Sequence, residues 1–363
     1  MTVYNFIVVC LHVMVFSLPS VSFGFQSDGP PPNQRQGLFD SEEVLNIRLE
    51  GDIETLLDDR GDDPSYHVLK LYVENMGLEE SLELRVRVRG NFRRLRENCD
   101  TPPLKFDFED HVVPVQSLFA GHPELKLVVP CKGEEYVARE YLTYTLYNLF
   151  TDYSFRVRMV QFTFDDTEKG ESSDPQYGFL IEDKEVLAAR KSASLVERMN
   201  LRPEIVEQEA FFRMSVFAYM IGNTDWSIQY LHNIELLFLN DERIYVAVPY
   251  DFDLVGLVSS PYARPSPALK LRSVRERVYR GYCLEDLSVL DATFEQFQEL
   301  KPEIYRTINE NALLEENYLE FATEYLDDFY DTLDNDRKRR REFSYPCNRF
   351  GTGNVVISGM RDG

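Results

Sequence analysis

The sequence predicts an α+β fold, rich in strands in its first half and in helices in its second half. Between residues 44 and 108, apolar and polar residues largely alternate with a period of two, which is typical of strands. After residue 184, apolar residues recur at helical spacing instead. One apolar hairpin, over residues 233–254, interrupts the helices.

The expected strands come before and after one expected helix. The first four should form an antiparallel sheet and comprise residues 44–49, 67–73, 82–89 and 104–108. A short strand at 125–129 follows, and residues 134–149 then carry a helical apolar stripe. Two further strands are expected at 155–165 and 177–181.

Helices account for most of the chain after residue 184. The segment 206–221 is apolar along one stripe, and Gly222-Asn223 should end that helix. The acidic segment 293–330 also has apolar residues at helical spacing. Its charge indicates a solvated outer face.

The composition is that of a globular protein. With 363 residues, 44% apolar and 13% aromatic content, the chain can bury a sizeable core. Its net charge of −23 argues against nucleic acid or an anionic membrane as a partner, because basic side chains supply most of the affinity for such polyanions.

The N-terminus has features of a secretory signal. An apolar run at residues 6–18 is followed by Pro19 and small residues up to Gly24. No Lys or Arg precedes the run, and it is short for a membrane span, so a core helix is the alternative. We expect cleavage, a secreted or cell-envelope location, and no stable membrane span in the mature chain.

Four cysteines would remain after signal removal: Cys99, Cys131, Cys283 and Cys347. No Cys-x-x-Cys pair or nearby His indicates zinc, so disulfides or buried thiols are the alternatives. We favour a Cys99–Cys131 pair because both lie close to expected strands of one sheet. From the sequence alone, three pairings are open.

Four polar side chains gather around the expected hairpin: Asp225, Asn233, Asp251 and Asp253. Asp225 lies in a turn and could accept a proton from a bound hydroxyl, or it could cap a short helix that starts at Trp226. Three carboxylates and a carboxamide predict a hard-cation site for Mg²⁺ and a nucleotide's phosphates. His232 should face away from this cluster, because side chains alternate along a strand.

This region resembles the catalytic segment of the CotH-like (spore coat protein H) kinases, an atypical branch of the protein-kinase-like fold. The upstream segments that carry the resemblance are Arg89-Gly90-Asn91, Pro103-Leu104-Lys105-Phe106, Lys126-Leu127-Val128, Ala138-Arg139-Glu140-Tyr141-Leu142 and Tyr177-Gly178-Phe179-Leu180-Ile181-Glu182. A two-lobed fold is implied. The expected parts are a signal peptide at 1–24, a linker at 25–40, an N-terminal lobe at 41–183, a C-terminal lobe at 184–345 and a tail at 346–363.

The resemblance also implies residues that bind the nucleotide. Lys105 would steady the phosphates, with Glu140 or a near neighbour as its ion-pair partner. Arg139 is a competing candidate for facing the phosphates, and further phosphate contacts should come from Arg89, Arg93 or backbone amides near Asn91. Glu182 would lie near the adenine-binding hinge.

Catalytic and metal-binding roles follow from the same resemblance. Asp225 would be the base or would orient the substrate. Asn233 and Asp251 would hold Mg²⁺ or Mn²⁺, with Asp253 as an accessory ligand.

The implied function is transfer of the ATP γ-phosphoryl group to a hydroxyl of an unknown protein substrate. The His-Arg-Asp triplet of ordinary kinases is absent, because Asn223-Thr224 precedes Asp225, and Gly90 stands without a glycine-rich loop. The alternative is therefore a catalytically inactive kinase-like protein with a binding or assembly role in the envelope or extracellular space.

Overall fold

The computed structural model describes residues 37–75, 78–109, 111 and 113–345. The expected signal peptide, most of the linker, and the tail with Cys347 lie outside the described residues. The described residues all belong to one compact unit, and the boundary between lobes at residue 183 stays a prediction.

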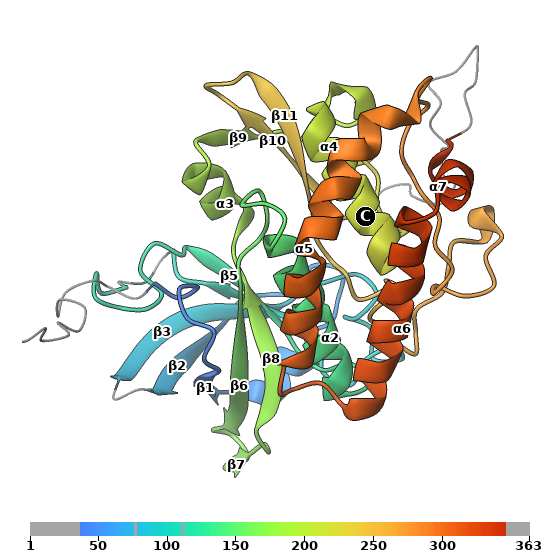
Figure 1. Ribbon diagram of the computed structural model, residues 1–363. Coiled ribbons are helices and arrows are strands. Elements are labelled where there is room, and N and C mark those ends of the chain that lie inside the picture. The colour runs from blue at the N-terminus through green and yellow to red at the C-terminus, as the bar shows by residue number, and fades with distance from the viewer. Residues whose placement is uncertain (1–36, 76–77, 110, 112, 346–363) are drawn as a thin grey trace, which may run out of the picture. The chain divides into compact units, whose positions relative to one another are not determined.

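Seven strands close into a barrel in the order β1-β2-β3-β4-β5-β8-β6, because β6 pairs back to β1 (Figure 1). A short strand, β7, extends β6. The strands are β1 (Leu45–Gly51), β2 (His67–Asn75), β3 (Leu78–Val88), β4 (Leu104–Asp107), β5 (Glu124–Val128), β6 (Val157–Asp166), β7 (Glu171–Ser172) and β8 (Gln176–Ile181).

The predicted antiparallel pairing of the first four strands is confirmed. The closed barrel corrects the sheet expected from the two-lobed kinase resemblance. Closure depends on a parallel pair, in which Leu45 is opposite Val160. The pattern of a single strand does not reveal a neighbour so distant in the chain.

Alternation gives the barrel strands two different faces. On β8, Leu180 belongs to the hydrophobic cluster inside the barrel, whereas Phe179 and Ile181 belong to the cluster under the helices. Both faces of this strand are therefore buried, which explains its continuous apolar sequence.

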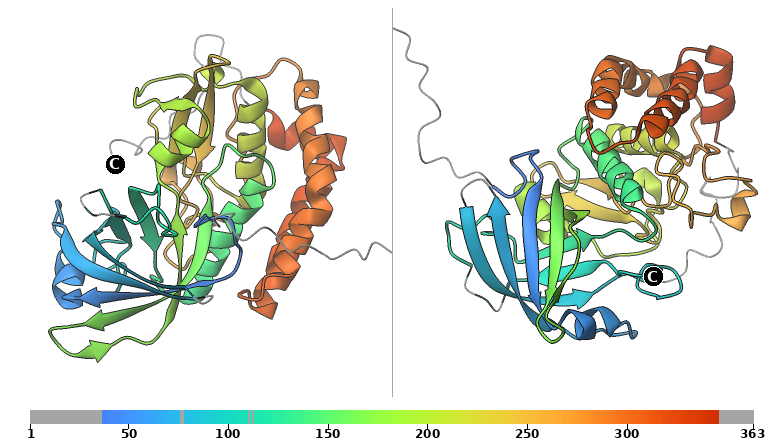
Figure 2. Two further views of the ribbon diagram at one scale, coloured as in Figure 1. Left: turned by 90° about the vertical axis from the view of Figure 1, so that its left-hand side faces the viewer. Right: turned by 90° about the horizontal axis from the view of Figure 1, so that it is seen from below.

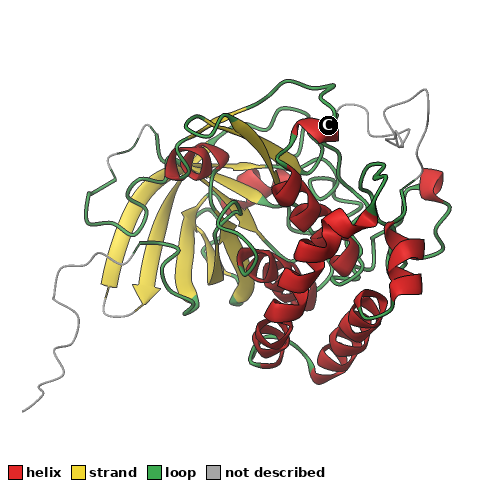
Figure 3. Cartoon of the chain, turned by 45° about the horizontal axis from the view of Figure 1, so that its top comes forward, coloured by secondary structure: helices red, strands yellow, loops and turns green. Residues whose placement is uncertain are grey.

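The C-terminal helices gather on one side of the barrel (Figure 3), whereas α1 (Ile53–Asp58) packs against β3 and β6. The other helices are α2 (Glu134–Asn148), α3 (Lys184–Arg190), α4 (Gln208–Ile221), α5 (Asp291–Asn309), α6 (Glu316–Leu333) and α7 (Asp336–Phe343), with short 3₁₀ turns at η1 (Pro203–Ile205), η2 (Pro267–Leu269) and η3 (Leu287–Leu290). Helix α2 packs against β6, β8 and α5, so it joins the barrel to the C-terminal helices (Figure 2).

The predicted hairpin is formed by β10 (Ile234–Leu239) and β11 (Ile244–Pro249), and β9 (Ala193–Leu195) adds a third strand. Helix α4 packs against β11. Because α4 is apolar on nearly all sides, it lies inside the helical cluster rather than on the surface.

The predicted disulfide between Cys99 and Cys131 is confirmed. It ties the loop after β3 to the segment before α2. Cys283 is also disulfide-bonded. Within the described ranges, no helix has both the length and the apolar character needed to cross a membrane.

Candidate functional site

The candidate site is built where two segments cross at a pair of glycines. Gly222 ends α4 in the left-handed conformation, with φ of 69°, and its carbonyl accepts a hydrogen bond from the Gly256 amide at 3.2 Å. A Cβ on Gly222 would collide with the Tyr325 hydroxyl and lie 3.2 Å from the Gly256 backbone. The two glycines therefore allow the loop after α4 to lie next to the segment after β11.

Replacing Gly222 by alanine should destabilise the protein by about 2 kcal/mol or more. The left-handed backbone alone costs an alanine roughly 1–2 kcal/mol, and the collision with Tyr325 adds to that cost. Urea unfolding measures the change in free energy. Gly170→Ala is the matched control, because Gly170 has φ of 66° and open space around an added Cβ. Equal losses in both variants would contradict the importance of the close crossing.

Asp225 lies in the loop between α4 and β10, and its side chain is 34% exposed. Its amide donates to Asn223 Oδ1 at 2.9 Å, which shapes the turn. Asn233 Nδ2 donates to the Asp225 carbonyl at 2.8 Å and to its Oδ2 at 3.1 Å. The structure thus brings these two predicted residues together. The helix-capping alternative is wrong, because no helix begins at Trp226.

The structure corrects the expected orientation of His232. Leu231 and Asn233 have left-handed φ values of 48° and 51°, and β10 begins only at Ile234, so strand alternation does not apply. His232 Nε2 lies 3.1 Å from Asp225 Oδ1. This hydrogen bond raises the pKa of His232. The two carboxylate oxygens of Asp225 therefore contact His232 and Asn233 separately.

Asp251 follows β11 beside the same loop. Its neighbour Tyr250 donates its amide to the Asn233 carbonyl at 3.1 Å. The amide of Asp251 donates to the hydroxyl of Tyr144 on α2 at 2.8 Å. Its carboxylate has no hydrogen-bond or ion-pair partner within the described residues. This carboxylate is thus free to meet a ligand.

Several groups act on the ionisation of Asp251. Desolvation by the surrounding protein raises its pKa, and the Asp253 carboxylate raises it further. Arg93 and Arg89 oppose this increase, and Asp225 adds a smaller one. The site therefore carries a local excess of negative charge that a cation would relieve.

The donor set fits a hard cation. Asn233 donates from Nδ2 to Asp225. The Oδ1 of Asn233 accepts no hydrogen bond from the part of the chain described. Mg²⁺ is usually held by one or two carboxylates together with substrate phosphates, which matches the unpaired Asp251. Among the described residues, no three His, Cys, Asp or Glu side chains converge on one metal position. The protein ligands alone would therefore form only part of the shell.

A buried arginine joins two of the predicted acidic residues. Arg93 Nη2 donates to Glu140 Oε2 at 2.6 Å, and its Nε donates to Asp253 Oδ2 at 2.8 Å. No side chain of the three is more than 10% exposed. Burial raises the pKa of Glu140 to about 7 against the opposing effect of Arg93, and Asp253 adds to the rise. Two carboxylates thus share one guanidinium.

The ion pair expected between Lys105 and Glu140 is therefore not formed. Lys105 Nζ pairs instead with Glu124 Oε1 at 2.5 Å, on the neighbouring strand β5. Arg93 takes its place at Glu140 because the loop after β3 folds inward, held by the Cys99–Cys131 disulfide. Arg93 lies in a loop without apolar periodicity, so its sequence does not predict the contact with Glu140.

Lys126 on β5 is a functional candidate that the sequence prediction did not assign. It is in register with Lys105, so both side chains lie on the same face of the barrel. Desolvation lowers the pKa of Lys126 to about 8, and the Arg89 charge also lowers it. Its ammonium has no carboxylate partner within the described residues and lies 5.3 Å from the centre of the Tyr250 ring.

Arg89 is another cation whose side chain has no partner among the described residues. It follows β3 and is half-buried, and its guanidinium makes no hydrogen bond or ion pair with the residues described. Its charge acts on Asp251, Lys126 and Tyr250. Arg89 and Lys126 thus supply positive charge on the barrel side of the candidate site.

Two other predicted residues are engaged elsewhere. The buried Glu182 carboxylate contacts Arg190 at 2.9 and 3.0 Å and accepts the Arg156 amide at 3.2 Å. Arg139 lies over the ring of Tyr318 on α6, 4.3 Å from its centre, and 3.4 Å from Glu315. Its guanidinium therefore packs against α6.

Arg280, from the segment before α5, holds the loop that carries Asp225. Its Nη1 donates to the carbonyls of Thr224 at 2.7 Å and Trp226 at 2.5 Å, the residues on either side of Asp225. Its guanidinium also lies 5.1 Å from the centre of the Trp226 ring. Arg280 lies far along the chain in an irregular segment, so nothing in the local sequence linked it to Asp225.

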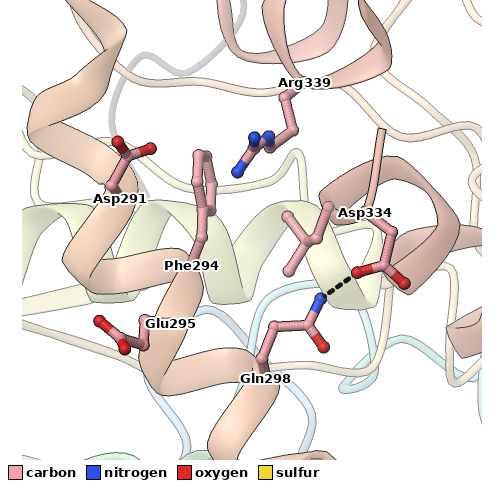
Figure 4. Close-up of a pocket in the computed structure, with 7 residues that line it drawn as sticks. Asp291, Phe294, Glu295, Gln298, Asp334 and Arg339 are labelled. Atoms are coloured by element: carbon pink, nitrogen blue, oxygen red, sulfur yellow. Dashed lines mark hydrogen bonds between the residues drawn. The ribbon is translucent and has the colours of Figure 1, made fainter. Parts of the chain in front are cut away.

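A separate pocket of about 370 Å³ lies between α5, the end of α6 and α7 (Figure 4). Gln298 closes one side by donating to Asp334 Oδ1 at 2.8 Å. The other lining residues include Asp291, Phe294 and Arg339. None of the predicted catalytic, nucleotide or metal residues lines it, so this pocket is distinct from the candidate site.

Comparison with protein-family models gives no match, and comparison with curated protein sequences gives none. Among solved structures, the chain is similar to CtkA, a proinflammatory kinase of Helicobacter pylori. The identity is 12%, the alignment covers 61% of this chain and 89% of that chain, and the TM-score is 0.35.

Proposed function

We propose that the chain is an atypical kinase that transfers the γ-phosphoryl group of ATP to a protein hydroxyl. One observation carries the proposal. Asp225 and Asn233 are hydrogen-bonded, and the Asp225 charge contributes to the raised pKa of Asp251. Arg89 and Lys126, which have no carboxylate partner among the described residues, act on the same group of charges. Phosphoryl transfer needs carboxylates for metal and proton, and cations for phosphates. The motif order that resembles CotH-like kinases supports the same function.

In this proposal each side chain has a defined task. Lys126 and Arg89 neutralise the phosphates and align them. The acceptor's hydroxyl oxygen forms a bond to the γ-phosphorus, the bond from that phosphorus to the β–γ bridging oxygen breaks, and ADP leaves with the electron pair. Asp225 accepts the hydroxyl proton on a carboxylate oxygen. His232 and Asn233 hold that carboxylate in position.

Asp251 and the Asn233 Oδ1 would hold Mg²⁺ or Mn²⁺. The metal, when bound, neutralises phosphate charge. Asp253 is the weaker candidate, because its Oδ2 already accepts from Arg93. Glu182 and Lys105 are also weaker candidates for nucleotide contact, since each has an internal ion-pair partner.

We also propose a secreted or cell-envelope location. The apolar N-terminal run supports it as a signal. The Cys99–Cys131 disulfide supports it as well, because disulfides persist mainly in oxidising compartments.

The test is a nucleotide-binding and phosphoryl-transfer assay on the mature chain. Mg²⁺-ATP should raise the melting temperature, and labelled γ-phosphate should reach the protein itself or an added protein substrate. Asp251→Asn should reduce the thermal shift, whereas Asp241→Asn, an exposed residue of the β10–β11 turn, should not. Failure to bind ATP with either Mg²⁺ or Mn²⁺ would contradict the proposal. Binding without transfer would favour the inactive binding protein.

Nucleotide affinity should fall as pH rises through about 8. The pKa of Lys126 is lowered to about 8, so its ammonium loses its proton in a range where an ordinary lysine stays charged. Titration calorimetry with ADP on either side of that pH measures the change. Lys126→Arg should remove the decline, because a guanidinium stays protonated. Lys105→Arg should retain it. A flat affinity in the wild type would exclude Lys126 from phosphate binding.

A further inference from the structure

The segment from Leu257 to Arg280 is basic in an acidic protein. The whole chain has 62 acidic and 39 basic residues. This segment contains six of the basic residues and a single acidic one, Glu276. The basic residues are Arg264, Lys270, Arg272, Arg275, Arg277 and Arg280. The sign of the charge is thus reversed locally.

Both ends of the segment are attached to the candidate site. Near its start, Ser260 Oγ donates to the Asp253 carbonyl at 2.7 Å. At its end, Arg280 donates to the carbonyls of Thr224 and Trp226, which flank Asp225. The segment therefore runs from the Asp251–Asp253 strand end to the Asp225 loop.

Two of the six basic residues hold the segment against other parts of the protein. Arg277 donates to the Met220 and Tyr325 carbonyls and pairs with Asp328, and Arg280 holds the Asp225 loop. The remaining four are exposed and have no carboxylate partner among the described residues: Arg264, Lys270, Arg272 and Arg275. Of these, Arg264 donates to the Pro261 and Ala263 carbonyls, and Arg275 donates to Ser259 and lies 4.4 Å from the centre of the Phe321 ring. The four charges are available to a ligand.

An aromatic pair, with Phe92 exposed and Tyr262 half-buried, adjoins the start of the segment. Phe92 is 45% exposed, and its ring centre lies 5.4 Å from that of Tyr262. Phe92 precedes Arg93, whose guanidinium contacts Glu140 and Asp253. Apolar and cationic groups are therefore presented together next to the candidate site, as in many protein-recognition surfaces.

We propose that residues 257–280 form a docking surface for an acidic stretch of the protein substrate beside its acceptor hydroxyl. This inference rests on the proposed kinase function and names its substrate class. Charges separated by more than about 8 Å are largely screened at physiological salt, so the local sign of charge decides the binding of a short acidic peptide. A nucleic acid or an anionic membrane extends over many such lengths and would meet the acidic remainder of the protein.

The experiment compares acceptor peptides that carry one Ser or Thr flanked by acidic, neutral or basic residues. Wild type should show kcat/KM roughly tenfold higher for acidic than for neutral acceptors, since each surface charge pair contributes modestly. The advantage should shrink at high salt. The variant Arg264→Ser/Lys270→Ser/Arg272→Ser should lose the preference for acidic acceptors, mainly because KM for the acidic peptide rises. Its ATP hydrolysis in the absence of acceptor should be unchanged.

The matched control is Arg337→Ser/Lys338→Ser/Arg340→Ser on α7, which removes the same charge from another basic segment. It should keep the preference for acidic acceptors. Equal kcat/KM for acidic and neutral peptides in an active wild type would overturn the inference while leaving the kinase proposal intact. Equal loss in both triple variants would also overturn it, as would binding to phosphatidylserine vesicles without any acceptor preference. Absence of ATP turnover and binding altogether would instead reject the kinase function.

Discussion

Asp225→Asn should slow phosphoryl transfer by about 10²- to 10⁴-fold, the usual contribution of a positioned general base. The substitution keeps the size of the side chain but removes the oxygen that accepts the proton. Nucleotide binding should change little, because the phosphates are assigned to Lys126 and Arg89. Single-turnover transfer and the thermal shift with Mg²⁺-ATP measure the two effects separately.

The control for this prediction is Asp241→Asn, which removes an exposed carboxylate from the β10–β11 turn and should leave both measurements unchanged. A transfer rate equal to wild type in Asp225→Asn would rule out Asp225 as the base. Loss of the thermal shift together with transfer would indicate that the loop between Gly222 and Asn233 had lost its shape.

Arg93→Met should destabilise the protein by about 3–5 kcal/mol, the cost of leaving buried charges without their partner. Glu140 and Asp253 would then lie close together in the interior with no cation between them. The loss should shrink as pH falls, because a protonated carboxyl group needs no counterion and the raised pKa of Glu140 favours the folded state at low pH. Chemical unfolding at several pH values measures this dependence.

Arg96→Met is the matched control in the same loop. Arg96 is 63% exposed in its ion pair with Asp58, so its loss should cost about 0.5 kcal/mol or less. Adding Glu140→Gln and Asp253→Asn to Arg93→Met should recover part of the lost stability. The difference between the unfolding free energy of this triple variant and the sum of the separate effects measures the interaction among the three side chains. Similar costs for Arg93→Met and Arg96→Met would show that the buried bridge is energetically unimportant.

The elements were largely predictable from the sequence because each depends on its own periodicity. The strand segments, α2, α4 and the hairpin follow directly from apolar spacing, since burial of one face decides local structure. The proximity of Asp225 and Asn233 could also be predicted, because only eight positions separate them and both lie next to the start of the same hairpin.

Contacts between distant segments were not predictable in the same way. Lys105 and Lys126 both alternate with apolar residues, and only the register of β4 against β5 and the position of Glu124 distinguish them. Arg93 lies in a loop without periodicity. The predicted orientation of His232 is wrong because the left-handed backbone at Leu231 and Asn233 breaks the strand pattern that the prediction assumed.

The parallel pairing of β1 with β6 has a consequence for synthesis of the chain. A nascent chain that has not yet reached Val157 lacks the partner for β1, so one edge of that strand stays unpaired. Exposed edges are sites of intermolecular pairing, and contacts between distant residues form slowly. Strand β1 can pair early with β2, but its other edge finds its partner only when β6, more than a hundred residues later, has been made. Fragments truncated before β6 should therefore aggregate where the full barrel does not.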